Sequence, residues 1–157
     1  MRWSTGIYLL YTLIKRNSKK DMSDERSELF IQHVRKVETF HDSFNIENNY
    51  QPTVTLTQQD IQLRFDLMRE ENEEYMEAAK NGDLVEVADA LGDQLYILLG
   101  TILKHGLQYK IEEIFNEIQR SNMSKLGADG KPIYREDGKV LKGPNYFRPD
   151  IKSILDK

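Results

Sequence analysis

Apolar side chains recur every three or four residues along most of the chain, which is the spacing of an amphipathic helix. This pattern predicts helices over about residues 24–43, 57–80, 83–105 and 109–126. A polar linker over residues 45–55 separates the first two helices, and the other connections are short. Four helices joined in this way indicate an all-α, four-helix bundle-like fold.

Glycine and aspartate mark the turn between the second and third predicted helices. Asn81-Gly82 should end the second helix, because glycine readily adopts the left-handed conformation that closes a helix. Asp83 can cap the third helix through its carboxylate. Since the connection is only two or three residues long, these two helices should pack antiparallel.

The last thirty residues have a different pattern. Asp129-Gly130 and Asp137-Gly138 are turn dipeptides. The short segments 133–135 and 139–141 flank the second turn and could pair as a small hairpin. Two prolines then favour an extended end, with a last helical turn near Ile151.

The chain therefore divides into three predicted parts. These are an N-terminal extension over residues 1–21, a helical domain over residues 22–126, and a basic hairpin and tail over residues 127–157. The extension contains an apolar run, residues 6–14, which is too short to span a bilayer and lacks the features of a signal peptide. One hypothesis is that translation naturally starts at Met22, so that the extension is not native.

Composition and charge narrow the classes of function. The absence of cysteine excludes a disulfide scaffold, a thiolate zinc site and a cysteine nucleophile, and it fits a cytoplasmic protein. The net charge of −4 is unevenly spread, because residues 120–157 hold nine Lys or Arg against five Asp or Glu. An acidic body argues against a nucleic-acid polymer as partner, and no segment favours a membrane. A metal ion could bind the acidic part and a phosphate the basic part, although solvated surface charge explains the counts equally well.

The second predicted helix carries acids on two of its sides. Its core stripe, drawn at about 100° per residue, consists of Ile61, Phe65, Met68, Asn72, Tyr75 and Ala79. Glu70, Glu73 and Glu77 fall on a solvent face. Glu71 and Glu74 fall instead within an apolar arc. These two acids are therefore expected to turn inward.

The third predicted helix is apolar nearly all round, which is typical of a central helix. Its main acids, Glu86, Asp89 and Asp93, lie on one stripe. A carboxylate buried there must be paired, protonated or bound to a cation, because an unpaired buried charge is very unfavourable.

Antiparallel packing brings the acids of the two helices to matching heights. Glu74 and Asp89 are about equally far from the turn, and so are Glu71 and Asp93. The pattern contains no arginine or lysine, so the cluster is repulsive unless a cation fills it. Oxygen ligands suit Mg²⁺, with Mn²⁺ as a second possibility, and such ions also bind substrate phosphates. The candidate reaction is therefore hydrolysis of a phosphoanhydride.

Other interpretations of these acids stay open. Glu86 could form a capping box with Asp83 and only satisfy backbone amides. Glu71 and Glu74 could be solvated if the apolar arc is narrower than drawn.

A histidine on the first helix gives a weaker signal. Glu38-x-x-His41 has the spacing of a di-iron ligand pair, but a ferritin-like site needs two such pairs and the chain has one. We therefore expect His41 to pack or to form a hydrogen bond.

The two acidic motifs carry a family resemblance. Glu70-Glu71-x-x-Glu74 followed by Glu86-x-x-Asp89 resembles the EExxE…ExxD signature of the all-α nucleotide pyrophosphohydrolases. This superfamily includes MazG-like proteins, dimeric dUTPases and phosphoribosyl-ATP pyrophosphohydrolases. Downstream, Ser121-Asn122-Met123-Ser124-Lys125 with Asp137-Gly138-Lys139 and Lys142-Gly143-Pro144 resembles a phage and bacterial phosphoribosyl-ATP pyrophosphohydrolase-like branch.

The resemblance, which covers roughly residues 57–126, implies Mg²⁺-dependent cleavage between the α and β phosphates of a nucleoside triphosphate. The products would be a nucleoside monophosphate and pyrophosphate. The metal ligands that it implies are Glu71, Glu74, Glu86 and Asp89. Glu70 and Glu71 become the catalytic pair, with Glu70 orienting the water. Asn122 and Lys125 become candidates for phosphate or sugar contact, and helical geometry adds Asp93 as a neighbour of the substrate.

The resemblance also implies a homodimer or homotetramer with sites completed across subunits, and the nearly all-apolar third helix fits this because a lone hairpin could not cover it. Two alternatives remain for the function. One is phosphoribosyl-ATP hydrolysis in histidine biosynthesis, which the extended tail disfavours because a compact enzyme is expected there. The other is a helical metal-binding or interaction module without catalysis.

Overall fold

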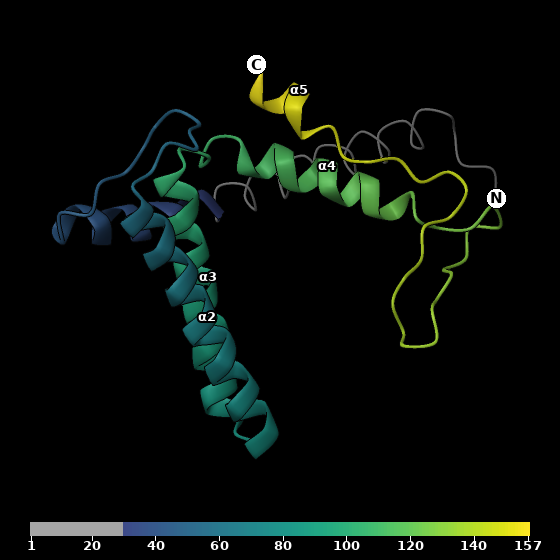
Figure 1. The fold of residues 1–157 in the computed structure, drawn as a ribbon, viewed down its shortest axis with the longest axis horizontal. Coiled ribbons are helices and arrows are strands. Elements are labelled where there is room, and N and C mark those ends of the chain that lie inside the picture. The colour runs from purple at the N-terminus through teal and green to yellow at the C-terminus, as the bar shows by residue number, and fades with distance from the viewer. Residues whose placement is uncertain (1–29) are drawn as a thin grey trace, which may run out of the picture. The chain divides into compact units, whose positions relative to one another are not determined.

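The structure, a computed structural model, describes residues 30–157, so the predicted extension over residues 1–21 lies outside the described residues. A first helix occupies residues 30–43 of the described part. The helices that follow it are α2 (Gln58–Asn81), α3 (Leu84–Lys104), α4 (Ile111–Met123) and α5 (Ile151–Leu155) (Figure 1). Within the described residues there is no strand beyond one isolated bridge. The all-α prediction is confirmed, and the helices predicted over residues 57–80, 83–105 and 109–126 agree with α2, α3 and α4 to within three residues. The first predicted helix ends at residue 43 as observed, and its predicted start at residue 24 lies outside the described residues.

The chain forms two compact units. The first contains the described residues up to Asn48 together with Gln62–Thr101, and the second contains Asn49–Ile61 together with Ile102–Lys157. Most of the α2–α3 pair therefore belongs to the first unit, and α4 and α5 belong to the second.

In the first unit, α2 and α3 run side by side in opposite directions (Figure 1). Gly82 between them has φ +70°, the left-handed conformation expected at a helix end. Asp83 caps α3 as predicted, because its Oδ1 accepts hydrogen bonds from the backbone N–H groups of Val85 at 3.0 Å and Glu86 at 3.2 Å. Farther along the pair, Gln94 Nε2 donates to the backbone carbonyl of Glu71 at 3.2 Å. This bond sets which residues of the two helices lie at the same height.

The first helix also belongs to this unit. Its Val34 and Val37 are buried. Phe40 meets Tyr96 of α3 edge to face, with ring centroids 5.7 Å apart. His41 is buried and hydrogen bonds to Asn48, as expected of a histidine that packs.

In the second unit, the linker before α2 binds the C-terminal end of α3. The backbone N–H of Asn49 donates to the carbonyl of Leu103, and that of Thr53 donates to the carbonyl of His105, both at 3.0 Å. The last carbonyls of a helix lack their usual partner one turn farther on, so these bonds help to satisfy the end of α3. Gly106 turns the chain with φ +65° and lies directly against the backbone of Gln51.

The tail of the second unit contains the predicted hairpin in a minimal form. The backbone N–H of Arg135 donates to the carbonyl of Lys139 at 2.8 Å, and that of Leu141 donates to the carbonyl of Ile133 at 2.7 Å. Farther on, Ser121 of α4 donates to the carbonyl of Phe147 at 2.8 Å, which holds the extended end beside α4. Among the described residues, no helix has both the length and the apolarity needed to cross a bilayer.

Gly106 and Gly82 give a matched test of this packing. Both have positive φ, so alanine at either position should cost about 1–2 kcal/mol of unfolding free energy through backbone conformation alone. A Cβ on Gly106 would lie 2.1 Å from the carbonyl oxygen of Gln51, whereas one on Gly82 would meet nothing within 4 Å. In urea unfolding, Gly106→Ala should therefore cost roughly 2 kcal/mol more than Gly82→Ala. Equal losses would contradict the close approach of the linker to the end of α3.

Candidate active site

Glu71 is the acid whose surroundings differ most from water. It lies near the middle of α2, and its side chain is half-buried. Its carboxylate oxygen Oε2 is buried and has no hydrogen-bond partner among the described residues. A buried polar atom in this condition is unfavourable unless a ligand or water satisfies it.

Other carboxylates surround Glu71. Burial raises the pKa of Glu71, and the negative charges of Glu74, Asp93, Glu70 and Asp89 raise that pKa further. These five acids, called the carboxylate cluster below, come from both α2 and α3. The structure thus brings together most of the residues that the sequence predicted. Glu71 is the half-buried member, and the other four are exposed in the single chain.

Glu86 stands apart from this group. It is exposed in the first turn of α3, and its backbone N–H is bound by Asp83. Glu86 is not among the four acids whose charges raise the pKa of Glu71 most strongly. Its predicted role as a metal ligand stays a prediction.

The cluster fits a hard cation by its chemistry but is not assembled around one. All of its side-chain donors are carboxylate oxygens, which are the ligands that Mg²⁺ prefers. The buried oxygen of Glu71 lacks a partner within the described part of the chain, and a cation would satisfy it. However, no three Asp, Glu or His side chains among residues 30–157 are placed to hold a metal ion as they stand. The exposed acids would have to rotate toward Glu71.

Asn122 and Lys125, the predicted phosphate or sugar contacts, lie at the end of α4 in the second unit. They contact each other, because Lys125 Nζ donates to Asn122 Oδ1 at 2.7 Å. This bond holds the ammonium group near the helix end, where a cation is favourable.

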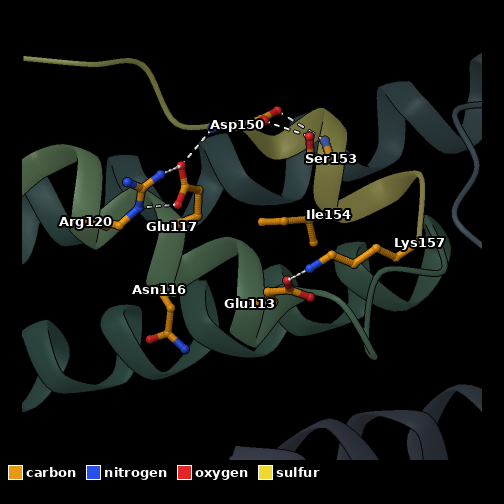
Figure 2. Close-up of a pocket in the computed structure, with 8 residues that line it drawn as sticks. All are labelled: Glu113, Asn116, Glu117, Arg120, Asp150, Ser153, Ile154 and Lys157. Atoms are coloured by element: carbon orange, nitrogen blue, oxygen red, sulfur yellow. Dashed lines mark hydrogen bonds and ion pairs between the residues drawn. The ribbon is translucent and has the colours of Figure 1, made fainter.

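A pocket of about 360 Å³ lies between α4 and α5 in the second unit (Figure 2). Four of its five charged side chains are paired with one another, and the fifth, Asp150, accepts hydrogen bonds from Ser153. Arg120 binds Glu117 at 2.8 Å, which lowers the pKa of Glu117, and Lys157 binds Glu113. The backbone N–H of Asp150 also donates to Glu117, at 2.8 Å. None of the predicted site residues lines this pocket. The Arg120–Glu117 pair lies within α4, whereas the bonds from Lys157 and from the Asp150 backbone join the residues on either side of α5 to α4.

Comparisons with known proteins show the family of the chain. A family model described as phosphoribosyl-ATP pyrophosphohydrolase matches residues 37–122, which is more than half of the chain. The chain belongs to this family. The matched segment contains all of α2 and α3, and with them every member of the carboxylate cluster.

Two individual proteins are also similar to this member of the phosphoribosyl-ATP pyrophosphohydrolase family. An uncharacterized protein of Acanthamoeba polyphaga mimivirus is 29% identical over 102 residues, which are 63% of this chain and 37% of that protein. The chain therefore spans little more than a third of the length of that relative. A solved structure, provisionally named an NTP pyrophosphohydrolase from Exiguobacterium sp. 255-15, is 24% identical, with a TM-score of 0.41. That alignment covers 76% of this chain and 90% of the other.

Gln94 is the site residue that the sequence did not single out. Its bond to the Glu71 carbonyl places the two helices in register. The available signal was a polar residue in an otherwise apolar stretch of the third helix.

The raised pKa of Glu71 predicts an unusual effect of Glu71→Gln on stability. A carboxyl whose pKa is higher in the folded state contributes stability at low pH that is lost as pH rises through that pKa. At neutral pH without divalent ions, the charged Glu71 should therefore destabilise the fold, and the neutral glutamine should raise Tm. The gain should shrink as pH falls below the usual glutamate range. Scanning calorimetry in chelator across this pH range checks it.

Glu77→Gln is the matched control, because Glu77 is an exposed acid on the same helix outside the cluster. This variant should leave Tm nearly unchanged. A lower Tm for Glu71→Gln in chelator at neutral pH would contradict the unfavourable environment assigned to Glu71.

Proposed function

We propose that the protein hydrolyses the bond between the α and β phosphates of a nucleoside triphosphate, releasing a nucleoside monophosphate and pyrophosphate. The observation that carries this proposal is the half-buried Glu71 carboxylate, which has an unsatisfied oxygen and four acids around it. Perturbed carboxyls of this kind concentrate at functional sites. Membership of the phosphoribosyl-ATP pyrophosphohydrolase family supports the same class of reaction.

The proposed cofactor is Mg²⁺, with Mn²⁺ as a substitute, held by Glu71, Glu74, Glu86 and Asp89. When bound, it would supply the positive charge that lets phosphate oxygens approach four carboxylates. Glu70, which is exposed and adjacent to Glu71 in α2, would orient the attacking water and accept its proton. The oxygen of that water bonds to phosphorus as the bridging P–O bond breaks, and pyrophosphate leaves with the bonding electrons.

The remaining predicted residues would bind the substrate rather than act on it. Asp93 lies in the cluster close to Glu71 and would help to position the metal-bound phosphates. Asn122 and Lys125, already joined by a hydrogen bond, offer an amide and an ammonium group to a phosphate or sugar.

Phosphoribosyl-ATP is the second candidate substrate, because the matching family model carries that description. It contains the same α–β phosphoanhydride bond, so the same carboxylates could serve. A helical metal-binding or interaction module without catalysis is the third candidate. Its interaction form is favoured by the observation that no three acids among the described residues are placed to hold a metal ion.

Pyrophosphate release from a panel of substrates separates these functions. The protein should release pyrophosphate from at least one nucleoside triphosphate in Mg²⁺, and phosphoribosyl-ATP belongs in the panel. Glu74→Gln should lower kcat at least about a hundredfold, because removal of a metal ligand removes charge that the transition state requires. Glu77→Gln should retain activity. No release from any compound with Mg²⁺ or Mn²⁺ would favour the binding module, and full activity of Glu74→Gln would contradict the ligand assignment.

We also propose that the protein is a homodimer or homotetramer. Four leucines of α3 lie within about 40° of one line along the helix, on the side away from the acids. They are Leu84, Leu91, Leu95 and Leu98, and they are 78%, 49%, 49% and 46% exposed in the single chain. A continuous exposed apolar stripe of this kind is typical of an interface between subunits.

Light scattering tests the role of this stripe. The protein should have at least twice the mass of one chain, and Leu91→Glu with Leu95→Glu should shift it to the monomer, because each glutamate would be desolvated in the interface. Val85→Glu is the control, since Val85 is 75% exposed but lies about 100° away from the stripe. Circular dichroism verifies that the helices persist. A monomeric wild-type protein would contradict the proposal.

A further inference from the structure

A second polar group lies in the first unit, apart from the carboxylate cluster. It is formed by His41 of the first helix and Arg64 of α2, which meet at Gly100 of α3. A Cβ on Gly100 would lie 3.0 Å from His41 Nε2 and 3.2 Å from Arg64 Nη1. The imidazole and the guanidinium therefore occupy the space that any larger residue at position 100 would fill.

His41 is fixed in this group. Its side chain is almost fully buried, at 2% exposure, and its Nδ1 lies 2.6 Å from Asn48 Oδ1. Since an amide oxygen can only accept, Nδ1 carries the proton and donates. The other amide atom, Asn48 Nδ2, is buried and has no hydrogen-bond partner within the described residues. Of the two ring nitrogens, Nε2 is therefore the one that can accept a hydrogen bond, and it lies on the side of Gly100 and Arg64. Arg64 itself is partly exposed.

The helical register places Arg64 in line with the cluster. Arg64 precedes Glu71 by seven residues, and Gly100 follows Asp93 by seven residues. Seven residues are two turns, so each pair lies on one side of its helix about 10 Å apart. Because the helices are antiparallel, both pairs extend in the same direction, away from the Gly82 turn. Along this side of the helix pair, carboxylates therefore lie at one level, and a guanidinium lies two turns farther from the Gly82 turn.

This arrangement suits a polyphosphate. The carboxylates repel phosphates, so beyond any bound cation the phosphate chain needs a second positive group. A guanidinium presents a planar fork of donors that matches two phosphate oxygens, which a single ammonium cannot do. A distance of about 10 Å along the helix is one that a phosphate chain and an arginine side chain together can bridge.

We propose that Arg64 is the residue that binds the terminal phosphate of the substrate. This inference rests on the proposed function and adds the orientation of the substrate to it. The phosphates extend from the cluster toward Arg64, and the nucleoside extends toward Glu86 and the Gly82 turn. Binding of the nucleoside, rather than of the phosphates, at Arg64 is the opposite orientation.

Calorimetric titration of inorganic tripolyphosphate in the presence of Mg²⁺ tests the site without any base. Arg64→Gln should weaken tripolyphosphate binding by about tenfold or more, because it removes a charge-assisted, two-pronged contact. Arg64→Lys keeps the charge but not the fork and should give a smaller loss. Titration with Mg²⁺ alone should change less than about threefold in both variants, because Arg64 lies two turns from the carboxylates.

Arg69→Gln is the matched control, because Arg69 is an exposed arginine of the same helix that binds Asp66 at 3.1 Å. It should bind tripolyphosphate as the wild type does. Unchanged tripolyphosphate affinity in Arg64→Gln would overturn the inference. The inference would also be overturned if Arg64→Gln lost affinity only for a nucleoside monophosphate, because that result would place the nucleoside at Arg64. If Arg64→Gln fails to fold, unchanged tripolyphosphate affinity in Arg64→Lys would overturn the inference instead.

The kinetic arm separates this inference from the proposed function. If the wild type hydrolyses a nucleoside triphosphate and Arg64→Gln leaves its KM unchanged, the phosphate site is wrong and the function stands. If the wild type hydrolyses no compound of the panel, yet tripolyphosphate binding depends on Arg64, the function is wrong and the phosphate site stands.

Discussion

The hydrogen bond from Gln94 Nε2 to the backbone carbonyl of Glu71 sets the alignment of α2 and α3, and the candidate chemistry depends on that alignment. With this bond made, Glu71 lies level with Asp93, and Arg64 lies level with Gly100. A shift of one residue would rotate the acids of α3 by about 100° away from those of α2. The Gly82 turn and the Asp83 cap favour the same alignment, because they begin α3 at a defined residue. Three local features thus agree on one arrangement of charge.

That arrangement is unfavourable for the protein alone. A chain selected only for stability would not place four acids around a half-buried carboxyl with an unsatisfied oxygen. The exposed leucine stripe on the other side of α3 is unfavourable in the same way. On the proposed function, a cation with its polyphosphate would relieve the first conflict, and a second subunit would relieve the other. The acids and the leucines lie on different sides of one helix, so substrate binding and assembly would not compete for the same surface.

Much of this fold could be predicted because its local signals are strong. The helix ends at Gly82 and Asp83 follow from backbone chemistry that depends on a few neighbouring residues. The grouping of Glu71, Glu74, Asp89 and Asp93 follows from helical periodicity and one short turn. Contacts between distant segments could not be found in this way. No periodicity indicates that the linker at Asn49 binds the last carbonyls of α3.

The same limit applies to the parts of the site. The sequence indicated that His41 would pack or hydrogen bond, but not that it meets Arg64 at Gly100, because that contact joins three helices. Residues Asn122 and Lys125 were grouped by a motif, and the structure adds that their side chains bind each other. The burial of the α3 side chains was also overestimated, because a helical wheel assumes that neighbours cover the helix. Within one chain, α3 is only partly covered.

The central claim is that the carboxylate cluster collects around a cation together with a polyphosphate. Crystals of the full chain grown with Mn²⁺ and a non-hydrolysable nucleoside triphosphate analogue test this most directly, because anomalous scattering locates the ion independently of any assignment. The account predicts an anomalous peak ligated by Glu71 and by at least one of Glu74 and Asp89, with phosphate oxygens completing its coordination. A peak elsewhere in the molecule, with the buried oxygen of Glu71 bound to a protein group, would contradict it.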